Sequence, residues 1–481
     1  MIEVIVNRLG FEYDIHSLVK AFFPKEDVSV RVQETFAEET GVRMELIFTD
    51  TLLTARLSEE QTLVDERTQQ IDYEDRKETK NHLKRHIYRI LSEYTGQTLP
   101  WGTLTGIRPV KLAMQLLEEG KSNTEIAAFM RDTYLASKEK TALSVMIANR
   151  ERHILRNIDY KDGYSLYIGI PFCPSTCLYC SFTSYPLSKW KKRVGEYLQA
   201  LFKELDYLSE GFRHKKLNTV YIGGGTPTTL LPEQMDRLLT KIETSFDRTY
   251  LQEFTVEAGR PDSITREKLQ VLLDHGIDRI SINPQTMKDE TLQIIGRHHT
   301  AEQTREAYKL AREMGFSHIN MDLIVGLPGE DCEDVERTME ELRVLAPDSI
   351  TIHSLAIKRA ARLNLFKEKY EEMGLHNNMQ IMDMTAIVCA EMGLFPYYLY
   401  RQKNMAGNFE NVGYAKADKA GIYNILMMEE KQTIVACGAG SVSKRVYPDG
   451  RIERSENVKD VSQYIERIGE MIERKRVLLE D

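Results

Sequence analysis

The sequence is short of cysteine, of long apolar runs and of net positive charge. Six cysteines in 481 residues are too few for a disulfide framework, so we expect thiols or metal ligands in a reducing compartment. No stretch approaches the roughly 18 apolar residues of a membrane helix, and Glu3 stands where a signal peptide would carry positive charge. With 64 Lys and Arg against 73 Asp and Glu, the net charge of −9 gives no diffuse positive field for nucleic acid. We therefore expect a cytoplasmic protein that binds neither nucleic acid nor a membrane.

The length and composition indicate a folded protein of several domains. Apolar residue types make up 42% of the chain and charged types 28%, which is close to the globular average. Changes of pattern along the chain predict four segments. These are an N-terminal α+β module over 1–99, a helical connector over 100–161, a barrel over 162–370, and a C-terminal accessory region over 371–481 that closes over the barrel mouth.

From residue 162 onward, β-branched runs alternate with helical periodicity, which is the pattern of βα units around a parallel sheet. Most of the expected strands are near-continuous apolar runs, as in a parallel sheet that helices cover. The six strands are Leu166–Phe172, Thr219–Gly224, Phe254–Ala258, Arg279–Pro284, Ile319–Val325 and Ser349–Leu355. The predicted fold class is α/β, a partial (βα)6 TIM-like barrel. In such a fold the functional residues follow the carboxyl ends of the strands.

The first 99 residues have the pattern of a small α+β module. The expected strands are Ile2–Val6, Val28–Thr35, Met44–Phe48 and Leu52–Leu57. A helix over Lys80–Tyr94 would carry its apolar residues on one side. The segment Trp101–Pro109 is rich in turn residues, and its Arg108 and Trp101 either contact a ligand or belong to a packed joint between domains.

Cysteines concentrate directly after the first barrel strand, where Cys173, Cys177 and Cys180 form a C-x3-C-x2-C motif. Soft thiolates on one short loop suit an iron–sulfur cluster. Three ligands for a four-iron cluster leave one iron open to a substrate's amino and carboxylate groups. A structural zinc site would want a fourth Cys or His nearby, and the loop through Pro186 has none. Zinc binding and unligated thiols remain the alternatives.

This cysteine loop resembles the signature of the radical S-adenosylmethionine (SAM) superfamily, whose members bind a [4Fe–4S] cluster on a partial βα barrel. The strings Tyr167–Cys173 and Gly223–Thr228 resemble the oxygen-independent coproporphyrinogen III oxidase family. Within that family, the Trp101–Pro109 segment and the string Tyr397–Asn404 are similar to the HemZ-type branch. The family likeness spans about residues 162–445. It implies a radical SAM barrel with Cys173, Cys177 and Cys180 as cluster ligands.

The resemblance also implies the residues that contact SAM. The glycine loop would hold the SAM amino group, Asp322 and Gln285 would bond the nucleoside, and Arg297 would pair with the SAM carboxylate as a charge-assisted fork. Tyr167 would be catalytic together with the three cysteines. The complete set of implied SAM contacts is Tyr179, Phe182, Gly224, Gly225, Thr226, Glu257, Gln285, Arg297 and Asp322.

The implied activity is oxidative decarboxylation of coproporphyrinogen III propionates to vinyl groups, giving protoporphyrinogen IX. An external donor such as a flavodoxin or ferredoxin would reduce the cluster, and the 5′-deoxyadenosyl radical from SAM would abstract hydrogen from a propionate. The tetracarboxylate substrate needs cations. The basic residues beyond the last strand that could supply them are Lys358, Arg359, Arg362, Arg401 and Lys403.

Two positions depart from the family's decarboxylases. Those enzymes have Cys where this chain has Phe182 and His where it has Gly169. Phe182 either packs against the barrel wall or shapes the adenine pocket. The aromatic residue is shared with the haem-chaperone branch, so the alternatives are a haem chaperone without decarboxylase activity and another radical SAM reaction on a tetrapyrrole.

Overall fold

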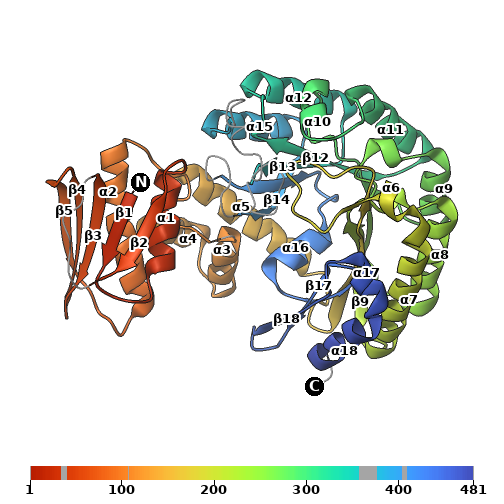
Figure 1. The fold of residues 1–481 in the computed structure, drawn as a ribbon, viewed down its shortest axis with the longest axis horizontal. Coiled ribbons are helices and arrows are strands. Elements are labelled where there is room, and N and C mark those ends of the chain that lie inside the picture. Colours follow the sequence, from red (N-terminus) through yellow and green to blue (C-terminus); the bar gives the residue numbers. More distant parts are fainter. Residues whose placement is uncertain (1, 34–40, 107, 357–375, 403–408, 480–481) are drawn as a thin grey trace. The chain divides into compact units, whose positions relative to one another are not determined.

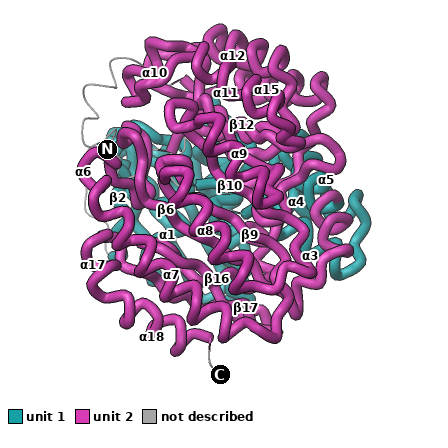
Figure 2. Tube along the Cα trace, turned by 90° about the vertical axis from the view of Figure 1, so that its right-hand side faces the viewer, with its two compact units in different colours: residues 1–149, 401–404 teal, residues 150–400, 405–481 magenta. Residues whose placement is uncertain are grey.

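A computed structural model describes residues 2–33, 41–106, 108–356, 376–402 and 409–479. The chain forms two compact units (Figure 2). Unit 1 comprises Met1–Asn149 with Arg401–Asn404, and unit 2 comprises Arg150–Tyr400 with Met405–Asp481. The predicted division of the chain at residues 99, 161 and 370 stays a prediction.

Unit 1 contains a five-stranded sheet with the strand order β2-β1-β3-β4-β5 (Figure 1). Strand β1 pairs in parallel with β2 and β3, and the rest of the sheet is antiparallel. The strands are β1 (Ile2–Val6), β2 (Val28–Val32), β3 (Val42–Phe48), β4 (Leu52–Glu59) and β5 (Thr62–Gln70). The helices are α1 (Glu12–Phe22), α2 (Arg76–Thr95), α3 (Pro109–Glu118), α4 (Asn123–Tyr134) and α5 (Lys138–Leu155), whose residues from Arg150 onward belong to unit 2. The predicted strands and the predicted helix at Lys80–Tyr94 are confirmed, except that the end of the predicted strand Val28–Thr35 lies outside the described residues; α1 and β5 were not predicted.

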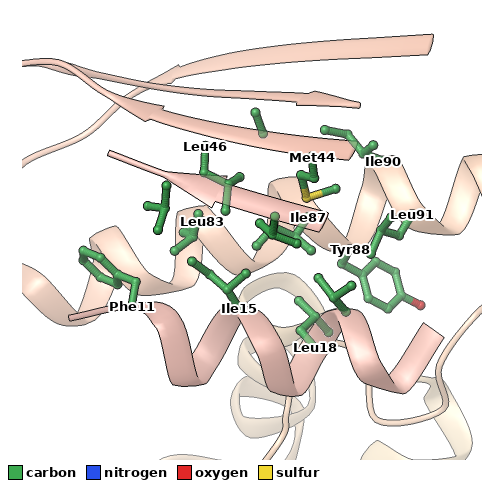
Figure 3. Close-up of a cluster of buried hydrophobic side chains, with 14 of the residues drawn as sticks. Phe11, Ile15, Leu18, Met44, Leu46, Leu83, Ile87, Tyr88, Ile90 and Leu91 are labelled. Atoms are coloured by element: carbon green, nitrogen blue, oxygen red, sulfur yellow. The ribbon is translucent and has the colours of Figure 1, made fainter. Parts of the chain in front are cut away.

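Helices α1 and α2 pack on one face of this sheet, and their apolar side chains fill the layer between helix and strand (Figure 3). Ile15 and Leu18 of α1 meet Met44 and Leu46 of β3 in the same buried cluster. Helix α2 begins at the N-cap residue Asp75, whose side chain accepts from the backbone N–H of Glu78 at 2.8 Å. Its apolar residues recur at helical spacing, which places all of them on the buried face.

Unit 2 is built on an eleven-stranded sheet with the order β14-β15-β13-β12-β11-β10-β9-β6-β16-β17-β18. The parallel strands from β6 to β13 are β6 (Gly163–Ile170), β9 (Lys216–Gly224), β10 (Glu253–Glu257), β11 (Arg279–Ser281), β12 (His318–Val325) and β13 (Ser349–Ser354). They confirm the six predicted barrel strands. Two short strands, β7 (Phe172–Cys173) and β8 (Tyr185–Pro186), pair with each other beside the end of β6.

The helices between these strands lie along the outer side of the sheet (Figure 1). They are α7 (Val194–Gly211), α8 (Pro232–Ser245), α9 (Arg266–Asp274), α10 (Asp289–Ile294), α11 (Ala301–Met314) and α12 (Cys332–Leu345), while the short helix α6 (Leu187–Trp190) directly follows β8. Local sequence signals explain several of their boundaries. Helix α11 starts with a capping box between Thr300 and Gln303 and ends at Gly315, which takes the left-handed conformation that glycine favours.

The C-terminal residues extend the sheet at both edges. On one side β14 (Phe395–Tyr400) and β15 (Asn411–Ala415) add antiparallel strands to β13. On the other side β16 (Thr433–Cys437) pairs in parallel with β6, and β17 (Val442–Val446) and β18 (Ile452–Glu456) follow it. The remaining described helices are α15 (Met379–Glu391), α16 (Ile422–Glu429), α17 (Val461–Glu466) and α18 (Ile468–Leu479). The predicted accessory region therefore includes strands of the barrel's own sheet.

Candidate active site

Three of the six cysteines lie on the loop that follows β6. Cys173 ends β7, and Cys177 and Cys180 come next along the chain before β8. The loop is tied to the turn after α10, because Ser175 Oγ donates to the carbonyl oxygen of Gly296 at 2.7 Å. The carboxyl end of the first barrel strand thus presents the cysteine motif, where the fold predicts functional residues.

The three thiols have different electrostatic surroundings. Burial raises the pKa of Cys173 to about 12 and also raises the pKa of Cys180. Burial raises the pKa of Cys177 as well, but the guanidinium groups of Arg297 and Arg260 outweigh it and lower that pKa below its ordinary value. Two buried cations therefore favour the thiolate form of the central cysteine, which is the form that binds metal.

This donor set fits an iron–sulfur cluster. Among the described residues, no group of three or more His, Cys, Asp and Glu side chains is arranged to hold one metal ion. A single-ion zinc site requires such an arrangement, whereas each thiolate of an iron–sulfur cluster can bind a different iron atom. The two buried guanidinium groups also match the negative charge that thiolate ligands bring. The residues that would hold the cluster are Cys173, Cys177 and Cys180.

The glycine loop after β9 packs directly on the start of the cysteine loop. A Cβ on Gly225 would lie 2.7 Å from the carbonyl oxygen of Phe172, and Gly224 has a φ of +104°. Glycine is therefore required here by the close approach of the chain itself. Thr226 Oγ1 donates to Cys173 Sγ at 3.6 Å, which links the loop to a predicted cluster ligand.

Glu257, at the end of β10, carries a carboxyl group with a raised pKa. Burial raises the pKa of Glu257 to about 7, although a hydrogen bond from Tyr221 opposes that rise; the carboxylate of Asp322 adds to it. Tyr221 Oη donates to Glu257 Oε1 at 2.5 Å. The Tyr221 ring stacks against those of Tyr167 and Tyr423, with centroid distances of 6.2 and 4.6 Å, and the Tyr167 and Tyr423 rings stack on each other at 6.4 Å. The predicted catalytic Tyr167 thus lies in a cluster of three mutually stacked tyrosines beside this carboxyl group.

Asp322 in β12 has the partners that a charge within a parallel strand needs. Asn320 Nδ2 donates to its Oδ1 at 2.8 Å, and His353 Nε2 lies 3.6 Å from its Oδ2. Burial raises the pKa of Asp322, but the contacts with His353, Asn320 and Thr351 outweigh burial and lower that pKa. Tyr400 Oη lies 3.3 Å from His353 Nδ1, so the contacts run from the carboxylate through the imidazole to a phenol. Asp322 is therefore ionised at neutral pH.

Gln285 is held in an unusual backbone conformation next to Asp322. Its φ is +68°, in the left-handed region that a non-glycine residue rarely adopts. Its backbone N–H donates to the Asp322 carbonyl at 2.9 Å, and its own carbonyl accepts from Ile324 at 2.9 Å. The amide oxygen Oε1 is buried and has no hydrogen-bond partner among the described residues. A strained, buried and unpartnered amide is the kind of group that a polar ligand completes.

Arg297 lies beside the cysteine loop. Its Nη1 donates to the carbonyl of Asn283 at 2.5 Å, and it interacts with Cys177 and Tyr179. Burial lowers the pKa of Arg297, but the groups of Tyr179 and Cys177 outweigh burial and raise it. Its Nε is buried and has no hydrogen-bond partner in the described part of the chain. The structure thus brings Cys177, Tyr179 and Arg297 together and leaves the Nε donor of the Arg297 guanidinium group for a ligand.

The backbone of Phe182 contacts the thiol of Cys180, but its side chain faces solvent. Its side chain is 71% exposed, so the expectation that it packs against the barrel wall is wrong. The alternative role in shaping an adenine pocket stays a prediction. The cysteines outside the motif have surroundings of another kind, since Cys389 and Cys437 are fully buried and Cys332 is partly buried.

Most of the basic residues that were predicted to bind the substrate lie outside the described residues. These are Lys358, Arg359, Arg362 and Lys403. Arg401 belongs to unit 1, where it is buried over the Trp101 ring and its Nη1 donates to the carbonyl of Leu104 at 2.5 Å. These contacts give Arg401 a role within unit 1.

Four residues at this site escaped the sequence analysis: Arg260, Tyr221, His353 and Tyr423. Arg260 follows the carboxyl end of β10, and Tyr221 and His353 lie in the carboxyl-terminal halves of β9 and β13, so their position in or after predicted strands was an available signal. Tyr423 comes from α16, far along the chain, and no local pattern connects it with β9.

Comparison with known proteins defines the class first. The profile of the Radical SAM superfamily matches residues 167–342. Among solved structures, the coproporphyrinogen III oxidase HemN from Escherichia coli, described as a radical SAM enzyme, matches with a TM-score of 0.52 and 22% identity, over 67% of this chain and 73% of HemN. That likeness is one of fold.

Sequence comparison is more specific. The chain is 44% identical over 409 residues to the oxygen-independent coproporphyrinogen-III oxidase-like protein HemZ of Bacillus subtilis (strain 168), which covers 84% of this chain and 82% of HemZ. It is 32% identical over 308 residues to the heme chaperone HemW of the same organism, over 64% of this chain and 76% of HemW. The chain belongs to the HemZ family of radical SAM proteins.

Membership of this superfamily implies SAM and an iron–sulfur cluster as cofactors. In the part of the chain that the structure describes, no helix is long and apolar enough to cross a membrane.

Proposed function

We propose that the protein is a radical SAM enzyme that oxidatively decarboxylates propionate side chains of coproporphyrinogen III to vinyl groups, giving protoporphyrinogen IX. The observation that carries the proposal is the 44% identity to HemZ over 84% of the chain, together with the three thiols at the end of the barrel. A flavodoxin or ferredoxin is the proposed electron donor.

The chain's own residues would bind and orient the cofactors. When bound, a reduced [4Fe–4S] cluster and SAM supply a radical that abstracts hydrogen from the substrate. Cys173, Cys177 and Cys180 would hold the cluster. Arg297, with one free fork donor, would bind the SAM carboxylate, and Gln285 with Asp322 would accept or donate hydrogen bonds at the nucleoside.

Glu257 and the tyrosines beside it would line the reacting side of the barrel. An ionised Glu257 would attract the positive charge of SAM, and Tyr221 holds its Oε1 in place. The rings of Tyr167, Tyr221 and Tyr423 form a stacked cluster next to that carboxyl group, which would limit water there. The glycine loop brings backbone donors close to the cysteine loop without a Cβ in the way.

A haem chaperone is the second candidate function. The 32% identity to HemW supports it, because HemW is named a heme chaperone, and so does the aromatic residue at Phe182. The shorter match to HemW, 64% of this chain against 84% for HemZ, favours the first candidate.

One experiment distinguishes the two functions. The anaerobically reconstituted protein is incubated with SAM, a reductant and coproporphyrinogen III, and product masses are followed. We expect stepwise loss of two carboxyl groups in wild type and none in Cys177→Ala, which should also lose the cluster's brown absorbance because a ligand is missing. Stoichiometric haem binding without turnover would replace the enzyme assignment with the chaperone. A Cys177→Ala protein that kept about four irons per chain would overturn the proposed ligand set.

A further inference from the structure

Arg260 is a buried arginine that neither the cysteine motif nor the proposed SAM contacts account for. It follows the end of β10 and is 2% exposed. Two of its guanidinium nitrogens form a fork with Asp262, with Nε donating to Oδ1 at 3.0 Å and Nη2 to Oδ2 at 2.9 Å. This fork fixes the plane of the guanidinium group and the direction of the remaining nitrogen.

The remaining nitrogen, Nη1, reaches the cysteine loop. It donates to Ser175 Oγ at 3.1 Å and to the Ser175 carbonyl at 3.3 Å, and it lies 3.9 Å from Cys177 Sγ. Asp262 therefore orients Arg260, and Arg260 in turn holds the loop between Cys173 and Cys177. Because the side chain is buried, its charge acts on Cys177 with little screening by solvent.

Other charged and titratable groups of the described residues lie around this contact. Arg297 is the second buried cation facing Cys177, and Asp262 is the carboxylate that partly offsets Arg260. His299 lies close by, with Nδ1 4.0 Å from Asp262 Oδ1. Burial, Arg297 and Arg260 lower the pKa of His299 to about 3, so its ring is neutral and adds no charge. The balance between Arg260 and Asp262 thus sets part of the field at the cysteine loop.

We propose that Arg260 is a positioning residue that holds the Ser175–Cys177 segment and raises the reduction potential of the iron–sulfur cluster, while Asp262 orients Arg260 and moderates its charge. The inference rests on the cluster of the proposed function and is independent of the substrate. An electron added to the cluster adds negative charge, which a fixed cation stabilises and a nearby carboxylate opposes. Charge and hydrogen bonding at the ligand sulfurs are known to tune cluster potentials.

The test compares the reduction potentials of reconstituted full-length variants by spectroscopically monitored redox titration without SAM. Arg260→Gln removes the cation, so we expect a more negative potential, with reduction at least about tenfold less favourable, or about 59 mV for one electron. Asp262→Asn retains the cation and removes the carboxylate, so we expect a shift in the opposite, positive direction. A role limited to holding the loop would not give opposite signs. Iron content per chain is measured in every sample.

The matched control is the ion pair between Arg312 and Asp348, in which Arg312 Nη2 donates to Asp348 Oδ2 at 2.5 Å. Asp348 directly precedes the amino end of β13. Arg312→Gln and Asp348→Asn should leave the potential unchanged. If Arg260→Gln failed to take up iron, the reduction potential of Asp262→Asn alone would test the inference. An unchanged potential in Asp262→Asn, or shifts of the same sign in both variants, would overturn the inference. Failure of the proposed function would look different from failure of this inference, because the wild-type protein would then bind a cluster but would not decarboxylate coproporphyrinogen III.

Discussion

Glu257 is a side chain of the candidate site whose ionisation lies near neutral pH. Its pKa of about 7 lies above the ordinary value of 4.5 because it is buried. Between these two values the unfolded chain has lost the proton that the folded protein keeps, so the contribution of Glu257 to stability falls as pH rises from 4.5 to about 7. The hydrogen bond from Tyr221 favours the ionised form and limits this effect.

Tyr221→Phe should move the pH dependence of SAM binding. If ionised Glu257 attracts SAM, affinity rises with pH through about 7 in the wild type. Loss of the hydrogen bond from Tyr221 destabilises the carboxylate by about 1.5–3 kcal/mol, which raises the midpoint by about one to two pH units. The measurement is the SAM dissociation constant from pH 6 to 9. Tyr250→Phe, at an exposed position, is the control, and an unchanged midpoint in Tyr221→Phe would separate Glu257 from SAM binding.

Arg297→Lys should weaken SAM binding while iron uptake persists. Lysine keeps the positive charge near Cys177 but lacks the planar fork that a carboxylate binds. Loss of one charge-assisted hydrogen bond costs about 1.5–3 kcal/mol, or ~10- to 150-fold in affinity. Equilibrium dialysis with labelled SAM measures the change, and cluster absorbance serves as the internal control. A SAM affinity equal to that of the wild type would remove Arg297 from the SAM site.

At the scale of elements, helix α18 is fastened to α7 by a buried polar network. Lys475 Nζ pairs with Glu204 Oε1 and donates to Asn457 Oδ1 at 2.7 Å. The other carboxylate oxygen, Oε2, accepts from Tyr464 Oη at 2.5 Å and from the backbone N–H of Gly438 at 2.9 Å. Both charged side chains are almost fully buried. The network therefore anchors the turn after β16, whose Gly440 lies against Thr183 of the cysteine loop.

Lys475→Met should destabilise the protein strongly, because it leaves the Glu204 carboxylate buried without its cation. Removing one partner of a buried ion pair costs about 3–5 kcal/mol. The urea midpoint of unit 2 unfolding measures the loss. Arg476→Met is the matched control on the same helix, since Arg476 makes an exposed pair with Glu473 and such pairs contribute about 0–1 kcal/mol. Adding Glu204→Gln to Lys475→Met should restore part of the stability, and equal midpoints for the two methionine variants would contradict the assignment.

At the scale of the whole molecule, the strand that carries the cysteine loop depends on the end of the chain. β16 pairs with β6 from Thr433↔Tyr164 to Cys437↔Ile168, on the side opposite β9. The sheet of unit 2 is thus completed only when β16, near the end of the chain, is in place, and β6 would be an edge strand without it. An apolar edge strand is prone to aggregate.

A chain ending at Lys431 should be insoluble and should bind no iron. The truncation exposes the edge of β6 and also leaves Glu204 without Lys475. The measurement is the soluble fraction after expression, together with iron per chain after reconstitution. Two glycines inserted in the exposed turn at Pro448–Gly450 provide the control, because surface turns tolerate insertion and this variant keeps β16. A soluble, iron-binding truncated chain would show that β6 does not need β16.

The sequence alone determined the elements whose signal is local. Six barrel strands were predictable because each is an apolar run followed by a helical period, and α2 because its apolar residues recur on one face. The cysteine motif was predictable because its ligands lie within a few residues of each other. By contrast, β5 is polar and largely exposed, so it has no apolar alternation to reveal it. Helix α1 does have buried residues at helical spacing, a signal that was present and was not used.

Only the tertiary structure decided which distant residues meet. The ion pair of Lys475 with Glu204 joins positions 271 residues apart, and Arg260 reaches Cys177 across 83 residues. The left-handed backbone of Gln285 arises from hydrogen bonds with β12, not from any preference of glutamine. Periodicity reports burial and spacing reports local motifs, but neither says which strand lies beside β6 or which cation faces a thiol. Those contacts follow from the packing of the whole chain, because each joins elements that come together only when the sheet is complete.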